Sequence, residues 1–300
     1  MPFLVLDGMT KRYASHGRWH PVLRDVTLDI PEGAFVSVIG ASGSGTTTLV
    51  SLAAGLMAPD AGTITMAGAA VTGPGPDRGV VFQSYSLLPW MTVLENVQLA
   101  VDATRPDWSP TARRARAEHF VHLVGLTDAR QKRPGELSGG MRQRVAVARG
   151  LATEPRVLLL DEPFSALDAL TRATLQRELA RIWTSARCTV LMITNDVDEA
   201  ILLADRIHVL APAPGGGSTL GPAIDVELPR PRVLRELNRS REYQRVRRAI
   251  VDTLASVRDA AQDLKGDSVP LLHAAEPRGG LFPQLAGARP RASRAEVGAE

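Results

Sequence analysis

Cysteine is almost missing from this chain, because Cys188 is the only one among its 300 residues. A single cysteine excludes a framework of internal disulfides and is consistent with a reducing compartment. Long apolar runs are missing too, and without a stretch of about 18 apolar residues we expect no membrane-spanning helix. The N-terminal residues MPFLVLDGMTKRY lack a charged segment followed by a long apolar one, so we expect no signal peptide.

Dense blocks of Lys and Arg are absent as well. The net charge is only +3, and the pI near 9.4 comes largely from scattered arginines. This distribution argues against a nucleic acid as partner, and a solvated surface accounts for most of the charge. The chain does have 44% hydrophobic residues, enough for a full core, in a length that allows one large or two smaller domains.

Residues 137–168, LSGGMRQRVAVARGLATEPRVLLLDEPFSALD, concentrate three features that suit phosphate chemistry. The first seven of these residues form a small-residue turn that opens a helix, where free N–H groups and the helix dipole favour an anion. The apolar run 157–160 predicts a strand buried on both faces. Asp161 and Glu162 follow it, where an Asp can bind Mg²⁺ and a Glu can orient or deprotonate a water. Asp168 closes the next short turn.

A second phosphate motif follows the predicted buried strand 34–39. Residues 40–49, GASGSGTTTL, match the phosphate-loop pattern G-x-x-x-x-G-K-[ST] in every element but one. The glycines let backbone N–H groups wrap a phosphate, and Thr47 has the place of the hydroxyl that binds Mg²⁺. Thr46 stands where the pattern has lysine, so a hydroxyl replaces a positive charge.

These motifs, over roughly residues 3–230, resemble the ATPases of ABC transporters, with a signature motif at 137–143, a Walker B strand at 157–161 and a D-loop at Asp168. The resemblance implies an α/β fold, a P-loop NTPase core with an antiparallel edge sheet and an inserted helical subdomain. From patterning alone we expect strands at 22–30, 34–39, 62–67, 80–82, 157–160, 189–194 and 207–210, and helices at 46–56, 110–124, 169–183 and 232–263.

The resemblance also implies the site residues. Catalysis would fall to Glu162, to the Q-loop residue Gln83 and to the switch-loop residue Asn195. Mg²⁺ would be held by Thr47, Gln83 and Asp161. ATP would be bound by Tyr13, Gly40, Ala41, Ser42, Gly43, Ser44, Gly45, Thr46, Thr47 and Thr48. Ser138, Gly139 and Gly140 of the signature would serve the ATP of a partner subunit. We place Tyr13 in a polar loop, where it either stacks on adenine or is an ordinary surface tyrosine.

Two positions depart from the family pattern. Thr46 replaces the lysine, and Asn195 replaces the usual His, which contacts the γ-phosphate and can carry a proton. A charged contact to phosphate is about twice as strong as a neutral one. Because the lysine would stabilise charge on the γ-phosphoryl group during the reaction, its loss should slow phosphoryl transfer more than it weakens nucleotide binding. We therefore predict a nucleotide site of reduced intrinsic activity on this chain, while its signature serves the partner's site.

Residues 87–92 form an unusually apolar loop. The alternatives are a contribution to the core or an exposed patch, with Leu88, Trp90 and Met91 as anchors, that grips a membrane permease subunit as ABC ATPases do. We expect an ATPase domain over 1–230 with its helical subdomain at about 84–155, and a flexible break at 212–217. A basic helical extension would follow over 231–263, either a solvated helix or a contact for anionic headgroups, and then a disordered tail over 264–300.

Residues 83–97 and 192–207 look like importers of nitrate, sulfonate, taurine or bicarbonate, the nitrate type above the others. The resemblance implies a peripheral subunit on the cytoplasmic side of the inner membrane, in a homo- or heterodimer of ATPases, with permease subunits and a periplasmic solute-binding protein. Three alternatives remain open. They are an ordinary hydrolytic subunit, a regulator that binds ATP without hydrolysing it, and a soluble ABC protein of repair or translation.

Overall fold

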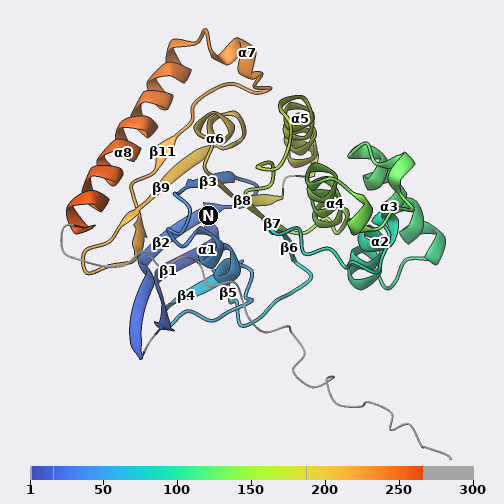
Figure 1. Cartoon of the computed structure of the whole chain (residues 1–300), viewed down its shortest axis with the longest axis horizontal. Coiled ribbons are helices and arrows are strands. Elements are labelled where there is room, and N and C mark those ends of the chain that lie inside the picture. The colour runs from blue at the N-terminus through green and yellow to red at the C-terminus, as the bar shows by residue number, and fades with distance from the viewer. Residues whose placement is uncertain (1, 16, 187, 266–300) are drawn as a thin grey trace, which may run out of the picture. The chain divides into compact units, whose positions relative to one another are not determined.

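A single path of strands organises the computed structural model, which describes residues 2–15, 17–186 and 188–265 (Figure 1). Its antiparallel part comprises β5 (Ala69–Ala70), β4 (Ala61–Met66), β1 (Pro2–Ser15) and β2 (Arg18–Pro31). Its parallel part runs β9 (Arg206–Pro212), β3 (Phe35–Ile39), β8 (Thr189–Thr194), β7 (Val157–Asp161) and β6 (Arg78–Val81). The short β10 (Ser218–Leu220) links the two parts, and β11 (Ile224–Asp225) pairs with β9. The predicted fold class is therefore confirmed.

Burial explains the two kinds of strand. All residues of β3, β7 and β8 are buried, as their unbroken apolar runs predict for strands covered on both faces. Alternate residues of these strands enter two separate cores. Val36 and Val38 pack with α1 (Thr46–Ala53), whereas Phe35 and Ile39 pack with the helices of the other face. Because only one face of β2 is buried over residues 26–31, its apolar and polar residues alternate there.

The helical insertion consists of three helices that pack on one another: α2 (Val93–Thr104), α3 (Pro110–Leu123) and α4 (Gly139–Ala152). Thr92 and Glu95 form a capping box at the start of α2. Ser109 caps α3 ahead of Pro110, as predicted. Two short 3₁₀ turns, η1 (Thr127–Ala129) and η2 (Pro134–Glu136), lead into α4. The proposed subdomain limits of 84–155 enclose these elements and stay a prediction.

The remaining helices are α5 (Ala169–Ala186), α6 (Val197–Leu203), α7 (Leu234–Leu237) and α8 (Arg241–Lys265). Some predicted bounds were wrong. Helix α1 ends at Ala53 and not at Leu56, because Gly55 takes φ +76°. Residues 212–217 form a hydrogen-bonded turn that joins β9 to β10, and not a flexible break. The predicted tail from 264 lies outside the described residues, except that α8 includes 264 and 265.

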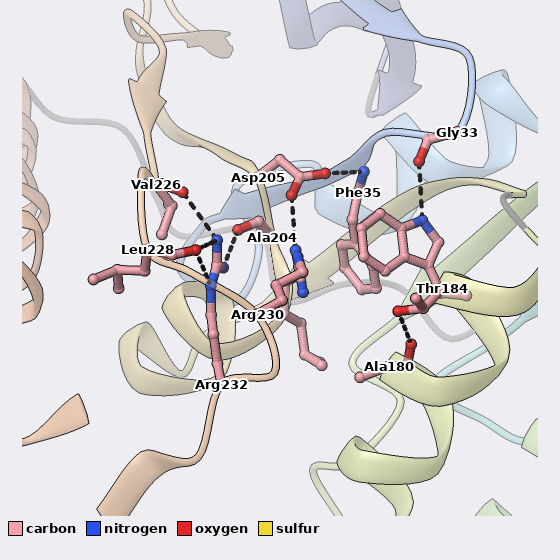
Figure 2. A network of polar contacts seen from close by, with 12 residues as sticks. Gly33, Phe35, Ala180, Thr184, Ala204, Asp205, Val226, Leu228, Arg230 and Arg232 are labelled. Carbon is pink, nitrogen blue, oxygen red and sulfur yellow. Dashed lines mark hydrogen bonds and ion pairs between the residues drawn. The ribbon is translucent and has the colours of Figure 1, made fainter. Parts of the chain in front are cut away.

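The predicted helix 232–263 was also wrong at its start, since α7 and α8 are separate and Arg232 precedes both. Arg232 is buried, and its guanidinium donates hydrogen bonds to backbone oxygens of Ile201, Ala204, Val226 and Leu228. Figure 2 shows the bonds to the last three of these residues. Burial, and next the neighbouring Arg230, lowers its pKa to about 10, so it stays charged at neutral pH. This side chain fastens the segment after β11 to the end of α6.

Arg230 extends the same network toward α5 (Figure 2). Its guanidinium pairs with Asp205 at 2.8 Å and lies 4.3 Å from the ring of Trp183. The indole of Trp183 donates to the Gly33 carbonyl, and Asp205 accepts the Phe35 N–H. These contacts join α5, the start of β3 and residues 224–232.

Among the described residues, every helix is too short or too polar to span a membrane.

Candidate functional site

The residues predicted to bind phosphate and Mg²⁺ and to act in catalysis follow neighbouring parallel strands at one edge of the sheet. The register pairs Ile39 with Thr194, Asp161 with Ile193, and Val81 with Leu160. Parallel strands end at the same edge, so the loops that follow β3, β8, β7 and β6 emerge together. The phosphate loop (residues 40–48), the switch loop (residues 194–196), the acidic pair and Gln83 are therefore brought to one place.

The phosphate loop has the shape that an anion requires. Gly43 and Gly45 take φ of +84° and +97°, and Gly45 is the N-cap of α1. A side chain at Gly45 would lie 2.8 Å from Val22 and 2.9 Å from Leu23, so only glycine fits. No side chain in the described part of the chain caps α1, which leaves its first N–H groups for a ligand. The residues present therefore fit the phosphates of a nucleotide.

Thr46 is buried under this loop. Its methyl carbon lies 2.8 Å from the position that a Cβ on Gly40 would take, so the short side chain turns inward below the loop. A lysine has four carbons with which to reach the phosphates, whereas threonine ends at its hydroxyl. The structure thus places a neutral, short group where the family pattern has its cation.

Asp161 and Thr47 make contact beneath the phosphate loop. Asp161 is 1% exposed, and burial raises the pKa of its carboxyl while a hydrogen bond from the Thr47 hydroxyl opposes the rise. Its second oxygen, Oδ2, is buried with no hydrogen-bond partner in the described structure. A buried carboxylate oxygen without a donor is costly unless a cation meets it. The arrangement fits Mg²⁺ held by oxygen ligands.

Glu162 is held by its backbone as well as its side chain. Its φ of +47° is uncommon for a non-glycine residue, and its N–H donates to the Ile193 carbonyl over 3.0 Å. Its own carbonyl accepts the Gln143 side-chain amide at 3.0 Å. The Gln83 amide donates to Glu162 Oε2 over 3.1 Å. Burial first, and then the charge of Asp161, raises the pKa of Glu162, which suits a proton acceptor.

Asn195 is exposed at the end of β8, and its side chain forms no hydrogen bond within the described residues. The backbone around it is fixed. Thr194 donates its hydroxyl to the buried Glu199 at 2.7 Å, and the Asp196 N–H donates to the same hydroxyl at 3.0 Å. The side chain of Asp196 then caps α6. Asn195 is therefore a free amide on a firmly held loop.

Tyr13 lies in β1, opposite His20 of β2, so its predicted place in a loop was wrong. The two strands continue as a long antiparallel ribbon, because their pairing persists to Ser15 and Arg18. The Tyr13 hydroxyl lies 3.5 Å from the Thr48 hydroxyl at the end of the phosphate loop. Its side chain is 40% exposed beside α1, which is compatible with stacking on a base and leaves that role a prediction.

The signature residues lie at the start of α4 and not at the ends of the parallel strands. Ser138 caps α4, its hydroxyl accepting the Met141 N–H at 3.3 Å, and it is exposed. Gly140 packs against residues 166 and 167, just before the D-loop residue Asp168, whose side chain caps α5 through the Thr171 N–H. That hydrogen bonding lowers the pKa of Asp168. The signature thus presents an exposed helix N-terminus, capped by Ser138, beside the D-loop.

Residues 87–92 contribute in part to the core and in part to an exposed surface, the two alternatives predicted for this loop. Trp90 is 66% exposed, whereas Leu88 and Met91 are half-buried and Leu87 packs against the core. Asn96 of α2 holds the loop by accepting the Leu88 N–H at 2.9 Å and donating to the Met91 carbonyl at 3.1 Å. Trp90 alone of the three predicted anchors projects as a large apolar side chain.

Sequence reasoning missed the contacts of three residues. Gln143 supports Glu162 from α4, Arg172 links Leu167 to Asp196, and Asp198 bonds to α8. Gln143 lies inside the signature stretch, yet no local pattern shows that it reaches 19 residues along the chain. Such pairings depend on tertiary packing and have no period to detect.

Three features define an ATP-binding cassette: a phosphate loop after a buried parallel strand, an acidic pair after the next strand but one, and a helical insertion whose last helix, α4, is opened by LSGG. The family described as ABC transporter matches residues 23–165. Two solved dimeric structures of the cassette MJ0796, one bound to ADP and Pi, match with TM-scores of 0.69 and 30% identity, over 75% of this chain and 99% of theirs.

The chain belongs to the ATP-binding proteins of ABC transporters, and it is an ATP-binding subunit of that type. It is 45% identical to the bicarbonate transport ATP-binding protein CmpD of Synechocystis sp., over 84% of this chain and 89% of that one. It is equally 45% identical to the nitrate import protein NrtD of Synechococcus elongatus, over 84% and 91%. It is 49% identical to NrtC of the latter organism, but spans only 39% of that longer protein.

Proposed function

We propose that this chain is the nucleotide-binding subunit of an importer for a small anion such as nitrate, bicarbonate or an alkanesulfonate, working at the cytoplasmic face of the cell membrane. The names of the relatives and their coverage over most of their length support the first two solutes. The permease subunits and a periplasmic solute-binding protein would select the anion.

The chain's own site divides the work among its residues. The glycine-rich loop binds the phosphates through backbone N–H groups, and Tyr13 contacts the base. Thr47, Asp161 and Gln83 hold Mg²⁺, which when bound neutralises phosphate charge during transfer. Glu162 orients or deprotonates the attacking water, with Gln83 keeping its carboxylate in place. Asn195 donates a neutral hydrogen bond toward the γ-phosphate.

The nucleotide site on this chain's own phosphate loop is impaired in phosphoryl transfer more than in nucleotide binding. One observation carries the proposal: the buried neutral Thr46 lies in the same loop as Thr47, whose contact with Asp161 is intact. Backbone N–H groups still hold ground-state phosphates. The charge that develops on the γ-phosphoryl group during transfer loses its cation, so the rate constant falls by more than the affinity.

The exposed N-terminus of α4 supports a second role for this chain, in the site of a partner subunit. Ser138, Gly139 and Gly140 would meet the ATP that a partner ATPase holds in its phosphate loop. The dimeric structures of the similar cassette MJ0796 support a dimer for this chain too. With an intact homologue as partner, this chain would complete one working site and hold ATP passively in the other. With itself as partner, both sites would lack the Lys and the His.

Purified chain, assayed alone for phosphate release, tests the impairment. We expect Thr46→Lys to raise kcat by about tenfold or more, since a charge-assisted contact replaces a neutral one, with a smaller change in the Kd for Mg·ATP. Asn195→His should add a further increase. Thr46→Gln is the matched control, because it lengthens the side chain without charge and should leave kcat low. Equal turnover by the wild type and Thr46→Lys would overturn the impairment.

A second arm of the experiment tests nucleotide binding itself. Equilibrium binding of a fluorescent ATP analogue with Mg²⁺ should be measurable for the wild type. Absence of binding, together with no gain in turnover when a competent homologous subunit is added, would refute the proposed role as an ATP-binding subunit. An ordinary hydrolytic subunit would instead show full turnover unaided, and a regulator would bind without turnover even as Thr46→Lys.

A further inference from the structure

Helix α8 packs against α6 and β9 (Figure 1). Its inner face carries Tyr243, Val246 and Ile250, which are all buried in the same core as α6. Helix α6 begins directly after the switch loop, so α8 supports the element that follows Asn195. The proposed function gives α8 no role.

Two side chains of α8 meet one carboxylate oxygen of α6. The Tyr243 hydroxyl donates to Asp198 Oδ1 at 2.7 Å, and Arg247 Nε donates to the same oxygen at 2.8 Å. Burial first, then the bond to Asp198, raises the pKa of Tyr243, so its hydroxyl keeps the proton that it donates. The Arg247 side chain is 45% exposed and solvent screens its charge, so the bond from the buried Tyr243 is the stronger anchor.

From Asp198 the contacts lead back to the switch loop. The Asp198 and Glu199 N–H groups donate to Asp196 Oδ1 at 2.9 and 3.0 Å, and the Asp196 N–H donates to the Thr194 hydroxyl at 3.0 Å. Asn195 lies between Thr194 and Asp196. Its backbone is therefore fixed on one side by β8 and on the other by the first turn of α6.

We propose that Asp198 is a positioning residue, through which Tyr243 and Arg247 of α8 hold the first turn of α6 and thereby place the Asn195 amide for the γ-phosphate. This inference rests on the proposed role of Asn195. An asparagine is shorter than a histidine and donates without charge, so its hydrogen bond tolerates less displacement. The first turn of α6 must then be held in place, and α8 holds it.

A purely structural role for α8 would have different consequences from a positioning role. If α8 only covers apolar surface, loss of the Tyr243 hydroxyl lowers the melting temperature slightly and leaves kinetics alone. If it positions Asn195, the same change lowers kcat, because the contact to the γ-phosphate strengthens during transfer, while KM for ATP hardly moves. The ratio of these two effects separates the alternatives.

The experiment uses the full chain with Thr46→Lys, in which turnover is expected to be high enough to measure. Tyr243→Phe keeps the buried ring and removes the hydroxyl, and Asp198→Asn removes the charge. Each should lower kcat by about fivefold, the low end of coupling between sites, with KM for ATP within about twofold. The double variant should be no worse than Asp198→Asn alone. Arg248→Gln is the matched control, an exposed arginine of the same helix, and should leave kcat unchanged.

Hydrogen exchange in the otherwise wild-type chain gives a readout that needs no turnover. Amides of residues 194–199 should exchange faster in Tyr243→Phe, by more than the slight fall in melting temperature accounts for. Unchanged kcat and unchanged exchange in both variants would overturn the positioning role. Failure of the proposed function shows differently, as absent Mg·ATP binding or as no gain from Thr46→Lys. In that case the exchange rates of residues 194–199 still show whether the contact of α8 with Asp198 stabilises the switch loop and the first turn of α6.

Discussion

The Gln83 amide and the Glu162 carboxylate meet at 3.1 Å, although 79 residues separate them in the sequence. The contact joins the loop after β6 to the end of β7, two neighbouring strands of the parallel sheet. Donation from Gln83 favours the charged form of Glu162, against burial and the charge of Asp161, which raise its pKa. A Q-loop residue thus tunes the group that we assign as the base.

Glu162→Gln should abolish turnover while leaving nucleotide binding intact. The amide cannot accept a proton, and loss of a general base costs about a hundredfold or more in kcat. Phosphate release in the Thr46→Lys chain measures the loss, and the Kd for a fluorescent ATP analogue measures the binding. Glu118→Gln, an exposed glutamate of α3, is the control. Turnover by Glu162→Gln that stays within about threefold of the Thr46→Lys parent would remove Glu162 from the chemistry.

The pH profile tests the same assignment from another side. A base works when deprotonated, so kcat should fall as pH drops through the raised pKa of Glu162, at a higher pH than for a glutamate with the ordinary value of 4.5. Gln83→Ala removes a hydrogen bond that lowers this pKa, so the acid limb should move to higher pH. A limb that moves to lower pH in Gln83→Ala would contradict the geometry.

Glu199 should make the folded protein more stable at lower pH. Burial raises its pKa to about 7 from an ordinary value of 4.5, and bonds from Thr194 and Gln176 oppose the rise only in part. The folded state then binds more protons than the unfolded state between these values. Its stabilising contribution is complete below about 4.5 and is lost as pH rises toward 7, a total of about 3 kcal/mol.

Urea unfolding of the wild type and Glu199→Gln at pH 5.5 and 8 measures this effect. The glutamine keeps the shape without a charge, so Glu199→Gln should gain stability relative to the wild type at pH 8 and keep less than half of that advantage at pH 5.5. Glu118→Gln corrects for the general effect of removing an acid. A difference between wild type and Glu199→Gln that is the same at both pH values would show that Glu199 does not titrate in this range.

Much of the fold follows from local pattern. The apolar runs at 35–39, 157–161 and 189–194 are buried strands because both faces of the parallel sheet are covered. Motif order then places Thr47, Asp161 and Glu162 at one edge, since parallel strands end together. These inferences need only periodicity and topology.

Other features needed the tertiary structure. Tyr13 was assigned to a loop because the residues after it are polar, but pairing with β2 extends the strand past it. The arginine-rich stretch that Arg232 opens predicts a basic helix, either solvated or facing anionic headgroups, whereas the burial of Arg232 depends on backbone oxygens elsewhere in the chain. The bond from Tyr243 to Asp198 likewise has no signal in either local segment. Propensity and period do not record such partners.

Trp90→Ala should weaken association with the permease subunits while sparing the ATPase domain. The side chain is 66% exposed, so its removal creates no cavity and should change the melting temperature by less than about 2 °C. An exposed aromatic that fills a partner's pocket often carries about 2 kcal/mol or more of binding energy. Copurification with co-expressed permease subunits measures the loss. Trp19→Ala, equally exposed at 65% in β2, is the matched control, and equal losses from both would refute a specific role for Trp90.

Arg232→Met should destabilise the domain strongly, although Arg232 lies far along the chain from the phosphate loop. The methionine fills part of the space but leaves the carbonyls of Ile201, Ala204 and Leu228 without a donor in a buried place. Stranded acceptors cost about 1–3 kcal/mol each, so we expect a loss of about 3 kcal/mol or more and a melting temperature lower by roughly 5–10 °C.

The choice of control decides what the Arg232 experiment means. Arg235→Met removes an exposed arginine of α7 with the same change of charge, and should leave the melting temperature within about 2 °C of the wild type. Arg232→Lys keeps the charge, but an ammonium group cannot reach all the carbonyl oxygens that the planar guanidinium contacts. Its melting temperature should therefore lie between those of the wild type and Arg232→Met. If Arg232→Lys is as stable as the wild type, charge at the end of α6 is what matters. If it matches Arg232→Met, the set of directed hydrogen bonds holds residues 226–232 in place.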